Sequence, residues 1–271
     1  MQVGDIIKVR APAGGFTIDA LESRPAVLLA AGVGITPMLS MVRTIVFEGL
    51  RKPHIRKAYL FVAARNLAER AFDREISDLL RQAGGAVQVI RILGDGTGAN
   101  EGEHYDRAGR IDADLLRATL PFDGYDFYMC GPQPFMQGLY DQLRALGTPD
   151  DWIHAEAFGP ASLTRSTDRA APELPAASET PVPVAFTKSG NEARWEPGSG
   201  SRLELAEARG LTPEFSCRTG NCGTCATKIL AGQVTYASAP QAKVDDDTAL
   251  ICCAVPAYAG AGSGDRLILD L

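Results

Sequence analysis

The sequence lacks an excess of positive charge, a long apolar run and an apolar leader. With 27 Lys and Arg against 33 Asp and Glu, the 271-residue chain has a net charge of −6 at pH 7, so we do not expect a nucleic acid partner. No run of about 18 apolar residues is present, so we expect no membrane span. No basic stretch and apolar run follow Met1, so we expect no secretory signal and a cytoplasmic protein.

Cysteine is scarce over most of the chain. Of six cysteines, only Cys130 lies before position 217, and the other five follow from there to position 253. A disulfide framework is typical of small secreted chains. Because no export signal is visible, the clustered cysteines favour metal ligation in a reducing compartment over disulfides.

A polar stretch divides the chain. Residues 161–182 are rich in Ala, Pro, Ser and Thr and have no apolar periodicity, which predicts a linker; a long surface loop inside one domain is the alternative. The total length also suits two domains. We therefore predict domains at 19–160 and 183–271, with 1–18 as a separate amino-terminal piece.

Continuous apolar stretches alternate with amphipathic stretches before the linker. Five strands are expected at 26–31, 57–64, 86–93, 125–130 and 152–157. Helices are expected at 37–49, 69–82, 112–119 and 133–146. This alternation predicts an α/β doubly wound parallel five-stranded sheet, with a ligand crevice at the carboxyl ends of its strands. After the linker, short alternating strands and one helix at 201–209 predict a small α+β domain.

Two glycine-containing turns follow predicted strands. The first strand runs into GVGITP at 32–37, and the fourth into CGPQPF at 130–135. Glycine lets the backbone approach a pyrophosphate, and a helix with Thr36 as N-cap and Pro37 in its first position would present N–H groups to a phosphate. An ordinary tight turn is the alternative, because proline replaces the third glycine of G-x-G-x-x-G. Cys130 alone would be read as a small buried hydrophobe.

The motifs GVGITP, AARN with a later Phe, CGPQPF and HAEAFGP occur in the order seen in the ferredoxin–NADP reductase superfamily. Residues 18–160 resemble its pyridine-nucleotide domain. The resemblance implies that the first turn holds the pyrophosphate, that Cys130 lies beside the nicotinamide, and that Arg65, with Arg70 nearby, reaches the adenosine ribose. The residues thus assigned to the nucleotide are Gly32, Gly34, Thr36, Pro37, Arg65, Cys130, Gly131 and Pro132. Arg65 could pair with a 2′-phosphate or be a solvated surface residue. The sequence therefore does not decide whether the nucleotide is NADH or NADPH.

The same family holds a flavin, FAD or FMN, in a barrel before the nucleotide domain. Residues 3–18 resemble the last strand of that barrel and the loop that follows it. We therefore expect 1–18 to be a remnant of a flavin-binding barrel, with the rest upstream of Met1 or in a partner chain; a simple strand capping the sheet is the alternative. The resemblance also places Glu156 near the flavin edge, although a surface-strand carboxylate is equally consistent with the pattern.

The carboxyl-terminal cysteines have a specific spacing. Cys217, Cys222 and Cys225 follow the pattern C-x4-C-x2-C, which is the plant-type [2Fe–2S] signature. Thiolates are the soft ligands that iron–sulfur clusters require, and the small residues between them let backbone N–H groups point at sulfur. Structural zinc more often pairs two C-x2-C knuckles, so zinc and unligated thiols are the weaker alternatives.

The fourth ligand is expected from the pair Cys252 and Cys253. Side chains alternate along a strand, so only one of the two should face the cluster. Plant-type ferredoxins have this ligand four residues before a proline, and Pro256 therefore selects Cys252. Residues 183–271 resemble the β-grasp ferredoxin domain of oxygenase reductases, with matches at 195–197, 203–206, 232–236 and 267–271. The domain order resembles the phthalate dioxygenase reductase group and flavodoxin-reductase modules.

This resemblance implies a flavin- and iron–sulfur-dependent electron-transport oxidoreductase. NAD(P)H would pass electrons through a flavin to the [2Fe–2S] cluster and on to a protein acceptor such as an oxygenase. A flavin is needed because a hydride carries two electrons and the cluster accepts one. One alternative is a ferredoxin-type carrier that does not itself oxidise NAD(P)H, because the flavin domain is absent. Another is a structural metal-binding module.

Overall fold

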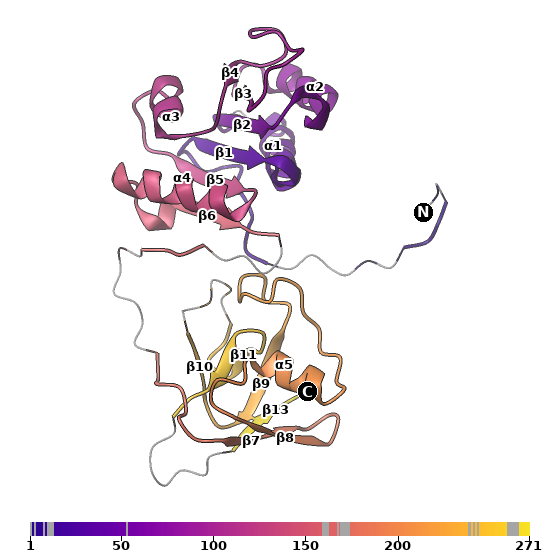
Figure 1. Cartoon of the computed structure of the whole chain (residues 1–271). Coiled ribbons are helices and arrows are strands. Elements are labelled where there is room, and N and C mark those ends of the chain that lie inside the picture. Colours follow the sequence, from indigo (N-terminus) through magenta and orange to yellow (C-terminus); the bar gives the residue numbers. More distant parts are fainter. Residues whose placement is uncertain are drawn as a thin grey trace. The chain divides into compact units, whose positions relative to one another are not determined.

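The computed structural model describes residues 2, 4–7, 9, 14–52, 54–158, 163–166, 168, 174–237, 240, 242, 244–258 and 266–271. The chain divides into two compact units (Figure 1). The nucleotide unit is Phe16–Ala170, and the cluster unit is Met1–Gly15 together with Ala171–Leu271.

The nucleotide unit is built on a six-stranded parallel sheet with the order β4-β3-β2-β1-β5-β6. The strands are β1 Ala26–Ala31, β2 Ala58–Ala64, β3 Val87–Leu93, β4 Arg107–Ala108, β5 Asp126–Cys130 and β6 Ile153–Glu156. All five predicted strands form, and the predicted fold class is confirmed. The sheet has one strand more than the predicted five, because β4 is an exposed two-residue edge strand with no apolar run to reveal it.

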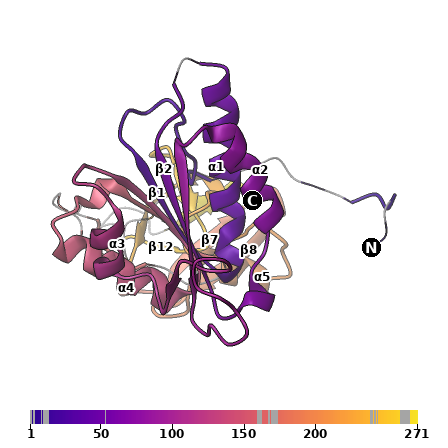
Figure 2. The same cartoon turned by 90° about the horizontal axis from the view of Figure 1, so that it is seen from above.

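Helices cover both faces of this sheet (Figure 2). On one face, α1 (Ile35–Leu50) and α2 (Asp73–Ala83) pack with Leu28 and Ala30 of β1. On the other, α3 (Ala113–Thr119) and α4 (Gln133–Ala145) pack with Val27 and Leu29. Short 3-10 helices are η1 (Gly32–Gly34), η2 (Leu67–Glu69) and η3 (Asp150–Trp152). Because successive residues of β1 point to opposite faces and both faces are covered, the strand reads as a continuous apolar run.

One helical stretch, Gly32–Leu50, is long and apolar enough to meet the criteria for a membrane span. Half of it is buried inside the nucleotide unit, where Met38, Leu39, Val42 and Ile45 belong to the core. A core helix of a globular domain has the same composition, so the stretch is weak evidence for a membrane.

The cluster unit contains a mixed five-stranded sheet with the order β11-β9-β13-β7-β8, a two-stranded pair β10-β12 and the helix α5. Its elements are β7 Val182–Phe186, β8 Asn191–Trp195, α5 Arg202–Ala208, β9 Ala226–Ala231, β10 Val234–Tyr236, β11 Thr248–Leu250, β12 Ala254–Pro256 and β13 Leu267–Leu269. A reciprocal capping box between Ser201 and Glu204 starts α5. The α+β, β-grasp prediction for this part of the chain is confirmed.

Described parts of the predicted linker 161–182 are bonded to the unit that each belongs to. In the nucleotide unit, the Gln137 side chain accepts from the Thr164 N–H at 2.9 Å and donates to the Thr164 carbonyl at 3.0 Å. In the cluster unit, the Thr235 hydroxyl donates to the Pro175 carbonyl at 2.6 Å. The residues between, 169–173, lie outside the described residues, and the predicted boundaries stay a prediction.

A buried ionic network joins the amino ends of the central strands in the nucleotide unit. Arg56 is 1% exposed and bonds one Asp126 oxygen at 2.5 Å, while Arg24 bonds the other at 2.5 Å. Arg56 also donates to the main-chain carbonyls of Arg24 and Asp19, at 2.7 and 2.6 Å. Asp126 is therefore the carboxylate that allows Arg56 to be buried.

We predict that Asp126→Asn destabilises the nucleotide unit by about 3–5 kcal/mol, because it leaves a buried guanidinium without its counter-charge. Urea unfolding followed by circular dichroism measures the change. Arg51→Ala, which removes an exposed pair with Glu48, is the control and should change stability by no more than about 0.5 kcal/mol. A loss in Asp126→Asn no larger than in the control would contradict this role.

Candidate nucleotide and cluster sites

The first glycine turn starts directly at the carboxyl end of β1. Gly32 has φ +57°, in the left-handed region that favours glycine. A side chain at Gly34 would overlap the carbonyl oxygen of Cys130 and lie 2.8 Å from the main-chain nitrogen of Gly131. A side chain at Gly131 would in turn lie 3.1 Å from the Ala31 carbonyl oxygen. The two turns predicted to hold the nucleotide therefore touch main chain to main chain.

The start of α1 corrects one prediction. The helix begins at Ile35 with Gly34 as its N-cap, so Thr36 is not the N-cap and Pro37 is not the first helical residue. Thr36 instead donates its hydroxyl to the Val33 carbonyl at 3.0 Å. Pro37 still lies in the first turn, where its missing N–H costs no helical hydrogen bond. The sequence motif did not reveal the 3-10 turn Gly32–Gly34 between β1 and α1. Because of this turn, α1 begins at Ile35, two residues earlier than expected.

Cys130 and Glu156 lie side by side on the adjacent strands β5 and β6. Cys130 ends β5 and is paired in register with Glu156 on β6. Cys130 is fully buried, and burial, with a smaller contribution from the Glu156 carboxylate, raises the pKa of its thiol to about 12. Burial also raises the pKa of Glu156. Cys130 is therefore a neutral thiol at pH 7, suited to packing against a ring and unsuited to acting as a nucleophile.

Two arginines near the end of β2 differ in availability. The Arg65 side chain is 86% exposed, and among the described residues it bonds Glu69, at 2.9 Å. Arg70 is 9% exposed, donates to Asp73 at 2.7 Å and also bonds the His104 carbonyl. Because an exposed i,i+4 ion pair is weak, Arg65 can turn toward a ligand at little cost, whereas Arg70 is fixed in the fold.

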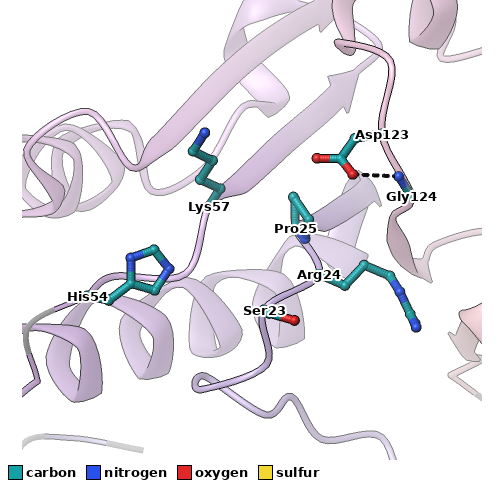
Figure 3. A pocket seen from close by; sticks show the side chains of 7 residues that line it. All are labelled: Ser23, Arg24, Pro25, His54, Lys57, Asp123 and Gly124. Atoms are coloured by element: carbon teal, nitrogen blue, oxygen red, sulfur yellow. Dashed lines mark hydrogen bonds between the residues drawn. The ribbon is translucent and has the colours of Figure 1, made fainter.

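A cavity of about 370 Å³ lies at the opposite end of the same sheet (Figure 3). It is lined by Ser23, Arg24, Pro25, His54, Lys57, Asp123 and Gly124. These residues precede β1, β2 and β5, so the cavity is at the amino ends of the strands. None of the predicted nucleotide residues lines it, and parallel sheets of this type bind ligands at the carboxyl ends.

The loop before β9 directs main-chain N–H groups at sulfur. The Cys217 sulfur accepts from the N–H groups of Thr219, Asn221 and Cys222 at 3.3–3.5 Å. The Cys222 sulfur accepts from the Cys217 N–H at 3.5 Å. Burial opposes ionisation of Cys217, but the hydrogen bonds from Thr219 and Cys222 outweigh it and lower its pKa to about 7. A loop that stabilises a thiolate in this way fits a metal-bound cysteine.

The vicinal cysteines lie in a turn between β11 and β12, where the Cys253 N–H donates to the Leu250 carbonyl at 3.0 Å. The expectation that strand alternation separates them is therefore wrong. Cys252 hydrogen-bonds with both Cys225 and Cys253, which lowers the pKa of Cys252 and raises the pKa of the other two thiols. Cys253 packs on the loop glycine, since a side chain at Gly220 would lie 2.8 Å from its sulfur.

Among the four predicted ligands, Cys217 contacts Cys222 and Cys225 contacts Cys252. Among the residues that the structure describes, no three His, Cys, Asp or Glu side chains are grouped as ligands of one metal ion. Two iron atoms with two protein thiolates each match this paired arrangement. The donor set therefore fits a [2Fe–2S] cluster, with Cys252 as the fourth ligand still a prediction.

Sequence reasoning missed Arg218 within the cluster loop. Arg218 has φ +58°, which is uncommon for a residue other than glycine. Its guanidinium bonds the Glu207 carboxylate, with Nη1 at 3.1 Å, and lies 3.9 Å over the Phe215 ring. These contacts hold the loop against α5. The spacing of the cysteines carries no signal for them.

Two families match the chain. Residues 28–141 match the oxidoreductase NAD-binding domain, and residues 186–257 match the 2Fe-2S iron-sulfur cluster binding domain. Together the two matches show a ferredoxin–NADP reductase-like chain with a carboxyl-terminal [2Fe–2S] domain. The family predicted from the motifs is thereby confirmed.

Individual relatives are oxidoreductases. The ferredoxin reductase component of 3-ketosteroid-9-alpha-monooxygenase from Mycolicibacterium smegmatis is 33% identical over 84% of this chain and 60% of its own length. A flavohemoprotein from Rhizobium meliloti is 36% identical over 59% of this chain and 38% of its own. The structure of an intact type IV self-sufficient cytochrome P450 monooxygenase matches with a TM-score of 0.58 and 25% identity, over 94% of this chain and 28% of its own. The chain thus spans 60% or less of each of these proteins.

We predict that Gly34→Ala disrupts the nucleotide site, because its new Cβ would overlap the Cys130 carbonyl. The two turns must move apart, so NAD(P)H binding measured by calorimetry should weaken at least about tenfold, or about 1.4 kcal/mol. Gly138→Ala is the matched control, since no atom lies within 4 Å of its new Cβ. Binding as tight in Gly34→Ala as in the control would show that contact between the turns is not needed.

The paired sulfurs predict different effects for the two vicinal cysteines. Cys252→Ser should lose most of the bound iron and labile sulfide, because it removes the partner of Cys225. Cys253→Ser should keep both, as measured by iron and sulfide analysis and visible absorption after anaerobic reconstitution. Loss confined to Cys253→Ser would reverse the assignment.

Proposed function

We propose that this chain oxidises NAD(P)H together with a flavin and passes the electrons through a [2Fe–2S] cluster to a protein acceptor such as an oxygenase. One observation carries the proposal: a nucleotide-type pair of glycine turns occurs in the same polypeptide as a thiolate-stabilising loop of three cysteines and a fourth cysteine that contacts it. The Mycolicibacterium relative is a ferredoxin reductase component of a monooxygenase, which supports an oxygenase as the kind of acceptor.

The nucleotide would bind at the carboxyl end of the parallel sheet. The main chain of Gly32 and Gly34, at the amino end of α1, is suited to a pyrophosphate because exposed helix N–H groups attract anions. Thr36 is exposed beside it, and Arg65 is available for the ribose or a 2′-phosphate. Cys130, with Gly131 and Pro132, would position the nicotinamide as a neutral, closely packed surface.

A flavin supplies the conversion of two-electron to one-electron transfer when it is bound. We assign residues 1–18 to the wall of a flavin-binding barrel. Ile6 and Val9 are 98% and 80% exposed, as expected of strand residues that a barrel would bury. Residues 1, 3, 8 and 10–13 of this segment lie outside the described residues. Glu156, beside Cys130, would lie at the flavin edge.

The cluster end of the proposed path is built from the chain's own main chain and thiolates. The N–H groups of Thr219, Asn221 and Cys222 favour the ionised form of the Cys217 sulfur, and Cys225 and Cys252 lie in the core. Thiolates of this kind need a reducing compartment, so we propose that the protein works in the cytoplasm.

We expect NADH or NADPH to reduce the cluster of the reconstituted full chain under anaerobic conditions only when FAD or FMN is supplied. The electron paramagnetic resonance signal of the reduced cluster measures this, with dithionite as the positive control. The rate with flavin should exceed the rate without it at least about tenfold, since the hydride donor cannot deliver single electrons. A cluster that dithionite reduces but that no nucleotide and flavin combination reduces would favour the ferredoxin-type carrier instead.

A further inference from the structure

An arginine is completely buried in the cluster unit, and no carboxylate of the described residues pairs with it. Arg202 is the first residue of α5 and is 0% exposed. Its Nη2 donates to the Gly200 carbonyl at 3.2 Å, and its guanidinium lies 4.7 Å over the Trp195 ring. Its Nε and Nη1 atoms have no hydrogen-bond partner among the described residues. This is an unusual site for an arginine, because a buried cation is normally paired.

Local structure does not neutralise this charge. The first turn of a helix favours acidic side chains over basic ones. The nearby Glu204 carboxylate accepts from the Ser201 N–H at 2.7 Å and the Ser201 hydroxyl at 3.2 Å, in the capping box. Burial lowers the pKa of Arg202 to about 9, which still leaves the side chain protonated at pH 7. The cluster unit therefore contains an internal positive charge that its described carboxylates do not offset.

The start of α5 is bonded directly to the cysteine-bearing turn. The Leu203 N–H donates to the Ile251 carbonyl at 2.8 Å, and the Ile251 N–H donates to the Cys225 carbonyl at 3.4 Å. Ile251 is followed by Cys252. Both cysteines pack in one hydrophobic core with Leu203 and with Trp195, the ring under the guanidinium. Charges that share such a core interact more strongly than charges separated by water.

We propose that Arg202 is the internal counter-charge of the cluster and raises its reduction potential. This inference rests on the proposed function, because it requires a cluster held by the four cysteines. Four thiolates and two sulfides outweigh two ferric ions, so the bound cluster is an anion and gains a further negative charge when it accepts one electron. A buried cation stabilises the reduced form more than the oxidised form, and net charge is one of the factors that set the potential.

Arg218 is a second cation near the cysteines among the described residues, and it differs from Arg202 in two respects. Its side chain is 38% exposed, and Glu207 pairs with it. Its field is therefore largely cancelled and screened by water and salt. Among the described residues Arg202 has no paired acid, and its side chain is buried from solvent, which makes it the stronger influence on the cluster.

The test compares neutral variants at Arg202 with the removal of a surface charge at the opposite end of the same helix. Arg202→Met and Arg202→Gln remove the buried charge, and Arg209→Met removes an exposed one. Each full-length chain is reconstituted with iron and sulfide, and the midpoint potential is measured by a titration followed by visible circular dichroism at low and high salt. Both Arg202 variants should move the midpoint to more negative values at either salt concentration. Arg209→Met should leave it close to wild type.

Midpoints equal to wild type in either Arg202 variant that loads a cluster would overturn the inference. Failure of both to load, with unchanged far-ultraviolet dichroism, would also overturn it, because Arg202 would then be needed for assembly and not for the potential. A wild-type chain without iron and sulfide would refute the proposed function itself. Analysis of iron and sulfide before each titration separates that result from a failure that concerns Arg202 alone.

Discussion

The cluster unit depends on main-chain N–H groups that point at cysteine sulfur. Three N–H groups converge on the sulfur of Cys217, which requires a loop that folds around that atom. Gly220, at φ +77°, and Arg218, at φ +58°, supply the left-handed turns. The same hydrogen bonds favour the thiolate over the thiol, and the thiolate is the form that binds iron. The same hydrogen bonds therefore fix the conformation of the loop and prepare Cys217 to bind iron.

In the nucleotide unit, the structure depends on a close approach between the turns that follow β1 and β5. Parallel pairing of β1 with β5 sets Ala30 opposite Cys130, so the turns that follow the two strands must meet. Glycine at positions 34 and 131 lets them meet main chain to main chain. The buried pair of Arg56 and Asp126 lies at the other end of these strands. A ligand site at the carboxyl ends and a structural network at the amino ends are consistent with the usual division of such sheets.

Much of the fold could be predicted because both units follow strong local rules. The continuous apolar runs of β1, β2, β3 and β5 and the cysteine spacing were sufficient for the architecture and the cluster class. The edge strand β4 was missed because its residues are exposed and its pairing is set by the tertiary fold. Thr36 was misplaced as an N-cap because no pattern distinguishes a 3-10 turn from the first turn of an α-helix.

The remaining features depend on contacts that a single sequence does not display. Cys252 and Cys253 were expected on a strand, and the turn that carries both depends on how β11 and β12 are joined. Arg202 occupies what reads as the ordinary polar start of a helix after Ser201. Only the packing of Trp195 and Gly200 around it reveals a buried charge. The sequence predicted the positions of most helices and strands, but it did not predict which side chains are buried or paired.

Electron paramagnetic resonance of the anaerobically reconstituted chain, combined with metal and sulfide analysis, tests the central claim most directly. The account predicts equal amounts of iron and labile sulfide, about two of each per chain, and a low-temperature signal of a one-electron-reduced [2Fe–2S] cluster after dithionite is added. Zinc in place of iron, or iron without labile sulfide and without that signal, would contradict it.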